Sequence, residues 1–241
     1  MMRFLAGVRY DGSKYYGFQK LKDKKTVQGE LEKAISKINK KPTSIKGAGR
    51  TDRGVHAYKQ IIHFDLDIDI SPKSLTKAIN SIIDKGIFVN YCQVVNNNFH
   101  SRFKVKRKTY EYRLNIGPFD PLIDDYIYNY NHSLNINKMK QGAKYLLGYH
   151  SFEAYVCGKR NHYNTALFSI KIKKKNNILI ITFEGQSFYQ YMVRNLVGAL
   201  IMVGEEKIKP IALKEMLIKR KNIYHYSNAP AQGLYLIDIK Y

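Results

Sequence analysis

The sequence predicts an α+β fold of two ferredoxin-like halves, each with the order β-α-β-β-α-β, whose sheets join into one antiparallel sheet. Segments with alternating apolar residues, typical of strands, are separated by segments with apolar residues at helical spacing. The same order of elements occurs twice within 241 residues. No long linker or low-complexity tail interrupts the chain, and the two halves are expected at residues 1–105 and 106–241.

The first half contains two helices whose starts are marked by capping residues. Thr26 is a typical N-cap and is followed by apolar residues at helical spacing. Ser71 is a second N-cap, and Pro72 suits the first turn of a helix. The four strands of this half are expected at residues 2–10, around Ile45, at 60–68 and at 87–95.

The second half repeats this pattern with longer strands. Its four strands are expected at residues 108–116, 165–173, 178–185 and 233–241. Its helices are expected at residues 135–148 and 187–204, with a short additional helix at 210–220.

The charge of the chain points to a polyanionic partner. Lys and Arg number 41 against 19 Asp and Glu, which gives a formal net charge of +22. Nucleic acid and an anionic membrane surface both fit this charge. A membrane role is disfavoured, because the sequence has no basic amphipathic helix with a clean apolar face and no apolar run of spanning length. The start of the chain has no apolar run resembling a secretory signal, so the sequence predicts a soluble intracellular protein.

One glycine-rich basic loop carries the best candidate for chemistry. The segment GAGRTDRGVHAYKQ, residues 47–60, holds a single carboxylate, Asp52, between Arg50 and Arg53. An Asp that merely caps its own turn is the plain interpretation. However, the flanking arginines should lower the pKa of Asp52 and keep it ionised. An ionised carboxylate in a basic loop suits nucleophilic or proton-transfer work on an anionic polymer.

A second acidic cluster has a plainer interpretation. Asp65, Asp67 and Asp69 fall on one face of an expected strand, as the ligands of a metal would. We expect instead that they form the solvent face of an edge strand, where like charges discourage pairing with other strands. The seven His and two Cys show no metal-ligand spacing, so no metal site is expected.

The loop at residues 47–60 is part of a wider resemblance that runs along almost the whole chain. GAGRTDRGVHA closely resembles the central motif of the tRNA pseudouridine synthase A family. Four further segments resemble other motifs of that family in the same order: YDGSKYYGFQ at 10–19, FHSRFKVKRKTYEYR at 99–113, FYQYMVRNLVGAL at 188–200 and APAQGLYL at 229–236. The resemblance implies the pseudouridine synthase fold.

The resemblance also implies roles for individual residues. Asp52 would be the essential aspartate, Tyr110 the tyrosine stacked beneath the target base, and Arg194 the basic partner of the aspartate. Contacts to RNA are implied for five further residues: Arg50, Arg53, His56, Arg102 and Lys108. For His56, a role in loop structure is the alternative.

The implied activity is the isomerisation of uridine to pseudouridine at positions 38, 39 and 40 in the anticodon arm of tRNA. The family acts in the cytoplasm as a homodimer without cofactor or metal. The carboxylate of Asp52 would act as a nucleophile at C1′ or as a base that removes the C2′ proton, and the sequence does not choose between these paths. A noncatalytic RNA-binding module is the alternative function.

Three residues depart from the family pattern. Phe18 stands where Trp is usual, Ser101 where Ala is common, and Ser151 where the family commonly has Asp. None of them coincides with Asp52, Tyr110 or Arg194, so catalysis is expected to survive.

Overall fold

The computed structural model describes residues 1–241 and divides them into two compact units. Unit 1 comprises Met1–Lys106 together with Tyr235–Tyr241, and unit 2 comprises Arg107–Leu234. The predicted α+β class and the repeated order of elements are confirmed. The sequence placed the last strand in the second half, whereas the structure groups residues 235–241 with unit 1. The physical reason is that this strand pairs with a strand of unit 1.

Unit 1 is built on a sheet in which β1 (Met2–Tyr10) lies between β3 (His56–Leu66) and β4 (Ile87–Val94), antiparallel to both. The short β2 (Lys46–Gly47) pairs antiparallel with β3. The start of β3 also pairs in parallel with β10 (Leu234–Lys240).

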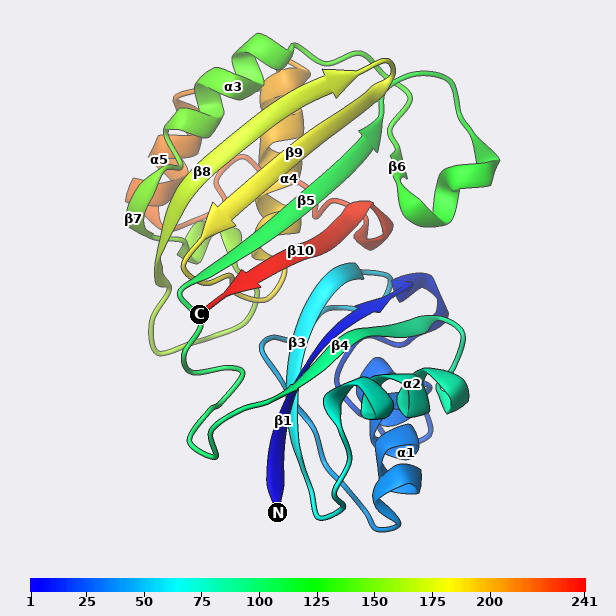
Figure 1. Ribbon diagram of the computed structural model, residues 1–241. Coiled ribbons are helices and arrows are strands. Elements are labelled where there is room, and N and C mark those ends of the chain that lie inside the picture. Colours follow the sequence, from blue (N-terminus) through cyan, green and yellow to red (C-terminus); the bar gives the residue numbers. More distant parts are fainter. The chain divides into compact units, whose positions relative to one another are not determined.

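Two capped helices cover one face of this sheet (Figure 1). Helix α1 (Val27–Asn39) begins where the Thr26 side chain accepts a hydrogen bond from the Gly29 N–H at 3.2 Å. Helix α2 (Pro72–Ile82) begins where the Ser71 hydroxyl accepts from the Ser74 N–H at 3.2 Å. Both predicted N-caps are therefore confirmed. The apolar side chains at helical spacing are buried against the sheet, which supplies most of the stability of helices this short.

Unit 2 has the strand order β5, β9, β8 and β7, and all neighbouring pairs are antiparallel. The four strands are β5 (Arg107–Asn115), β9 (Ile178–Gly185), β8 (Asn164–Lys175) and β7 (Gly148–Ser151). The short β6 (Tyr128–Asn129) pairs in parallel with β5. Three helices lie on one side of this sheet (Figure 1): α3 (Ile136–Lys144), α4 (Met192–Gly204) and α5 (Ala212–Lys219).

Two boundaries in unit 2 differ from the sequence prediction. The helix expected to reach residue 148 ends at Lys144, and residues 148–151 form β7, which was not predicted. The helix expected from residue 187 begins at Met192. Tyr191, the residue before it, has a φ of 60°, and this left-handed conformation cannot continue a right-handed helix.

The expectation that the acidic cluster forms one face of an edge strand is wrong, because β3 ends at Leu66 and both Asp67 and Asp69 follow its end. The carboxylate of Asp65 accepts two hydrogen bonds from Arg3, at 2.7 and 2.8 Å. Asp67 forms an ion pair with Lys41. No group of three or more His, Cys, Asp or Glu is arranged to hold a metal ion.

The helices are all too short or too polar to span a bilayer.

A buried histidine anchors the segment that follows β4. His63 on β3 is only 5% exposed, and its Nδ1 accepts a hydrogen bond from the Ser101 N–H at 3.2 Å. The Ser101 hydroxyl, also buried, donates to the Lys46 carbonyl at 2.9 Å. Both the backbone and the side chain of Ser101 thus take part in this anchor. Burial is the main cause that lowers the pKa of His63 to about 4, and the nearby charges of His100 and Arg3 contribute in the same direction.

The stability of the protein should therefore depend on pH through His63. In the unfolded state His63 has a pKa near 6.5 and is protonated below about that pH. In the folded state it becomes protonated only near pH 4, so protonation favours the unfolded state between these values. As the pH falls through this range, the unfolding free energy of the wild type should decrease by about 3 kcal/mol more than that of His63→Asn. Asparagine is chosen because it does not titrate and keeps an acceptor near the Ser101 N–H. Urea denaturation at several pH values from 7 to 4.5 measures this difference. Parallel pH dependences in the two proteins would contradict it.

Candidate active site

The glycine-rich loop lies between β2 and β3 of unit 1 and presents Asp52 at its tip. The Val55 N–H donates to the Asp52 carbonyl at 3.2 Å and closes a tight turn. The Asp52 side chain is half-buried, and Arg50 and Arg53 on either side of it are exposed. The loop therefore holds one carboxylate in a fixed turn flanked by two exposed guanidinium groups.

The segment YDGSKYYGFQ forms the support of this loop. The Phe18 N–H donates to the Thr51 carbonyl at 3.1 Å. The Tyr10 hydroxyl and the Thr51 hydroxyl are 2.8 Å apart and buried. Burial raises the pKa of Tyr10 to about 12, so its hydroxyl keeps its proton for this bond at neutral pH. Gly17, with a φ of +85°, brings its backbone against the Thr51–Arg53 backbone. The residue preceding Asp52 is thus held from two sides.

A second contact fixes the other end of the loop. An added Cβ at Gly12 would lie 2.1 Å from the Val55 carbonyl oxygen, so no side chain fits there. The Gly12 N–H donates to Nδ1 of His56 at 3.1 Å. His56 is buried, and its ring stacks on Tyr235 with centroids 4.7 Å apart. The Asp11 carboxylate lies 3.4 Å from the same Nδ1 atom, so this side of the ring is occupied by contacts within the protein. The geometry supports the loop-structure interpretation of His56, and its contact to RNA stays a prediction.

A cation–π cluster lies beside Asp52. The Arg53 guanidinium carbon lies 4.5 Å from the centroid of the Tyr16 ring, and the Lys24 ammonium lies 4.9 Å from it. The Tyr16 side chain remains 43% exposed. Aromatic contact of this kind restrains a long cationic side chain without neutralising it. The side chain of Arg53 is therefore held with its charge intact.

Unit 2 contains the other two predicted catalytic residues. Tyr110 lies on β5 opposite Phe183 of β9 and is 7% exposed. Its ring meets Phe188 edge-on, with centroids 5.1 Å apart. This packing fixes the plane of the Tyr110 ring, as a stacking surface for a base requires.

Arg194 lies in the first turn of α4, where the helix dipole disfavours a cation. Its Nε donates to the Ala229 carbonyl at 2.6 Å, and the Ala229 N–H donates to the Arg194 carbonyl at 3.2 Å. The guanidinium carbon lies 5.2 Å from the centroid of the Tyr191 ring. The Tyr112 hydroxyl donates to the Pro230 carbonyl at 2.7 Å, which holds the APAQ segment in place. The two C-terminal motifs thus orient one arginine.

The remaining predicted RNA-contact residues lie in both units. Arg102 in unit 1 is exposed, and its N–H donates to Nδ1 of His100 at 3.1 Å. Lys108 in unit 2 is half-buried on β5, opposite Gly185. Unit 1 therefore brings together Asp52, Arg50 and Arg53 in one loop, with His56 at the start of the strand that follows. Unit 2 holds Tyr110, Arg194 and Lys108.

Sequence reasoning did not assign a role to the residues that support the Asp52 loop. Tyr10, Gly12 and Gly17 all lie in the YDGSKYYGFQ motif, and Tyr16 in the same motif restrains Arg53. A signal was present in the motif itself, which carries two glycines and three tyrosines in ten residues, of which only Tyr10 belongs to a predicted element.

The sequence of this chain is similar to those of several known proteins. The sequence profile described as "tRNA pseudouridine synthase" matches residues 6–104 and 143–241. The tRNA pseudouridine synthase A of Borreliella afzelii is 41% identical over 246 residues, covering 100% of both chains. That of Pseudothermotoga lettingae is 37% identical over 245 residues, again with 100% of both chains covered. That of Limosilactobacillus reuteri is 35% identical over 250 residues, covering 100% of this chain and 97% of the relative.

Proposed function

This chain belongs to the tRNA pseudouridine synthase family, and from that premise we propose that it converts uridine to pseudouridine at positions 38, 39 and 40 of the tRNA anticodon arm. The observation that carries the proposal is the full-length identity of 35–41% to tRNA pseudouridine synthases A. The glycine-rich loop, which is held by backbone hydrogen bonds and presents the single carboxylate of Asp52, agrees with it. Acting on tRNA, the protein is expected in the cytoplasm.

The reaction breaks the bond between C1′ and N1 of uracil, turns the ring and joins C5 to C1′. The proton originally on C5 is then released, and N1, which has lost its bond to C1′, takes up a proton, so that the product is an isomer of the substrate. Asp52 is proposed as the group that attacks C1′ or removes the C2′ proton. Tyr110 is proposed to stack on the target base, and Arg194 to serve as the basic partner of the carboxylate. A uridine in a stack must first be extruded at a cost of a few kcal/mol, which aromatic and basic contacts offset.

The loss of the C5 proton gives a direct test. Unmodified tRNA with tritium at uridine C5 should release tritium to water when mixed with the wild-type protein. Sequencing of the product for pseudouridine at positions 38, 39 and 40 tests the site specificity. Good tRNA binding without any tritium release would indicate a noncatalytic RNA-binding module instead.

The chain is also proposed to act as a homodimer, and one surface of unit 2 supports this. Leu122 in the short helix η2 (Pro121–Tyr126) is 87% exposed, and Phe119 just before it is 59% exposed. Three aspartates surround them in a chain of net charge +22: Asp120, Asp124 and Asp125. An exposed apolar pair of this kind is typical of a surface that contacts another protein, and in a twofold dimer it would pack against the same pair of the second copy.

Light scattering should give a mass near twice 28.1 kDa for the wild type. Leu122→Lys should shift the protein toward the monomer, because a charge would enter the apolar contact. Ile218→Lys is the matched control: Ile218 is 70% exposed on α5, and its replacement should leave the dimer intact. A wild type that is monomeric and fully active at assay concentration would refute the dimer. An unchanged dimer in Leu122→Lys would refute this interface.

A further inference from the structure

Unit 1 carries a row of aromatic and basic side chains on the sheet face opposite its helices. The row consists of one residue from each of four neighbouring strands: Phe88 on β4, Arg9 on β1, Tyr58 on β3 and Tyr235 on β10. Arg9 lies opposite Phe88 in the strand register. The Arg9 guanidinium carbon lies 5.9 Å from the centroid of the Tyr58 ring. The rings of Tyr58 and Tyr235 stack with centroids 5.7 Å apart and planes inclined by 28°. We call these four residues the aromatic row.

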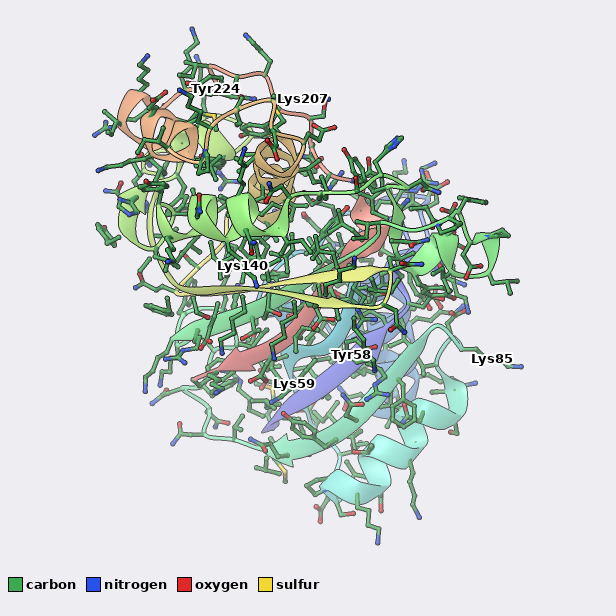
Figure 2. The ribbon with its side chains drawn as sticks, turned by 90° about the horizontal axis from the view of Figure 1, so that it is seen from above. Tyr58, Lys59, Lys85, Lys140, Lys207 and Tyr224 are labelled. Carbon is green, nitrogen blue, oxygen red and sulfur yellow. The ribbon has the colours of Figure 1, made fainter.

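The alternation of side chains shows which face the row occupies. Val8 and Val89, which precede Arg9 and follow Phe88, are both fully buried on the helix side. Because successive side chains in a strand point to opposite faces, Arg9 and Phe88 point away from the helices. Phe88 is 51% exposed and Tyr58 is 42% exposed, whereas Tyr235 is only 5% exposed and supports the Tyr58 ring from beneath. Figure 2 shows Tyr58 beside Lys59 at this sheet.

Arg9 differs from the other cations of the same face. Arg3 forms an ion pair with Asp65, and Lys59 forms an ion pair with Asp238 at 2.8 Å. Arg9 instead lies over an aromatic ring. A planar guanidinium on a ring can extend a stack, because its own flat face remains available for a base.

The row also lies next to the candidate active site. Tyr58 follows Asp52 by six positions in the chain, and Arg9 precedes Tyr10, whose hydroxyl meets Thr51 of the Asp52 loop at 2.8 Å. The row and the Asp52 loop thus belong to the same unit and to neighbouring segments of the chain.

We propose that the aromatic row is a stacking platform for unpaired nucleotides of the tRNA substrate that flank the reacting uridine. The inference rests on the proposed function. Unpaired bases bind to sheets chiefly by stacking on aromatic rings and arginine planes, and such contacts tolerate any base sequence. A platform of this kind would help a single active site to accept uridines in different sequence contexts.

RNA fits the row better than a second copy of the chain does. Arg9 places a cation within the row, and the net charge of +22 attracts a polyphosphate such as RNA.

The absence of tryptophan from the sequence allows a direct test. Tyr58→Trp and Phe88→Trp each create a protein with one tryptophan, whose fluorescence is quenched when a base stacks on the indole. Addition of unmodified tRNA should quench both strongly. Phe168→Trp is the matched control: Phe168 lies on β8 of unit 2, is 48% exposed and has the Arg107 guanidinium carbon 5.3 Å from its ring centroid. This control should show little quenching.

Affinity measurements supply the second part of the test. Tyr58→Leu and Phe88→Leu should each weaken tRNA binding by about tenfold, with an unchanged dependence on salt, because stacking involves no ion release. Arg9→Gln should weaken binding and also reduce the slope of log Kd against log salt by about 1. Phe168→Leu should bind like the wild type, and Tyr58→Phe should restore nearly full affinity.

Three outcomes would overturn the proposal. Wild-type affinity in both leucine variants, while the wild type releases tritium from tRNA, refutes the platform and leaves the proposed function standing. Equal weakening by Phe168→Leu shows that no special role belongs to this row. Conversion of the double leucine variant to a monomer in light scattering assigns the row to a subunit interface. Failure of the proposed function itself is recognised separately, as wild-type protein that releases no tritium.

Discussion

Replacement of Asp52 by asparagine is expected to lower the rate of pseudouridine formation by at least about a thousandfold. The amide keeps the size and much of the hydrogen bonding of the carboxylate, but it is a far weaker nucleophile and base. Affinity for tRNA should change little, because phosphate contacts supply most of it. Tritium release and tRNA binding, measured on the same preparation, separate the two effects.

Asp67→Asn is the matched control for this experiment. Asp67 also belongs to unit 1, but its carboxylate is ion-paired with Lys41, away from the glycine-rich loop. Its replacement should leave turnover near the wild-type value. An Asp52→Asn enzyme that retains a tenth of wild-type activity would remove Asp52 from the chemistry.

Gly12→Ala is expected to cost about a hundredfold in activity although residue 12 takes no part in the chemistry. The added Cβ would lie 2.1 Å from the Val55 carbonyl oxygen and 2.4 Å from the carbonyl carbon. Both are backbone atoms, so the turn from Asp52 to Val55 must move as a whole. A displacement of about 1 Å at a catalytic group can cost about 10²-fold in rate. Overpacking should also lower the unfolding free energy by about 1–3 kcal/mol.

Gly158→Ala separates this effect from the general cost of replacing glycine. Gly158 has a φ of +84°, but an added Cβ meets no atom within 4 Å. That variant should lose some stability through backbone strain and keep its turnover. Tritium release and urea denaturation of both variants decide the matter. A folded Gly12→Ala protein with wild-type turnover would show that the Asp52 loop does not depend on this contact.

The predictable parts of the fold were those determined by neighbours in sequence. Thr26 and Ser71 signalled the starts of α1 and α2, because an N-cap acts on the first turn that follows it. The start of α4 was predicted five residues early, since nothing local signals the left-handed conformation of Tyr191. Strand β7 was missed because four residues carry too little alternation to distinguish them from a helix end.

In the candidate site, too, the features that depend on neighbours in sequence were predictable and those that depend on distant contacts were not. Asp52 stood out because its loop concentrates glycine, arginine and one carboxylate within a few residues. Its support could not be predicted, because the contact of Gly12 with Val55 joins positions 43 residues apart and depends on packing. The anchor between His63 and Ser101 likewise depends on a backbone N–H that only the folded chain presents.

The assignment of β10 to unit 1 has a consequence for synthesis on the ribosome. Tyr235 pairs with His56, yet all of unit 2 must be translated between them. At about 5–20 residues per second, the strand that starts at His56 waits for roughly 9–36 s with its pairing groups open. Until then the nascent chain exposes a bare strand edge immediately after the Asp52 turn, and such edges pair readily with other chains. We therefore expect newly synthesised unit 1 to need protection from aggregation until β10 has been translated. Ribosomes that stall within unit 2 should release an aggregation-prone fragment without activity.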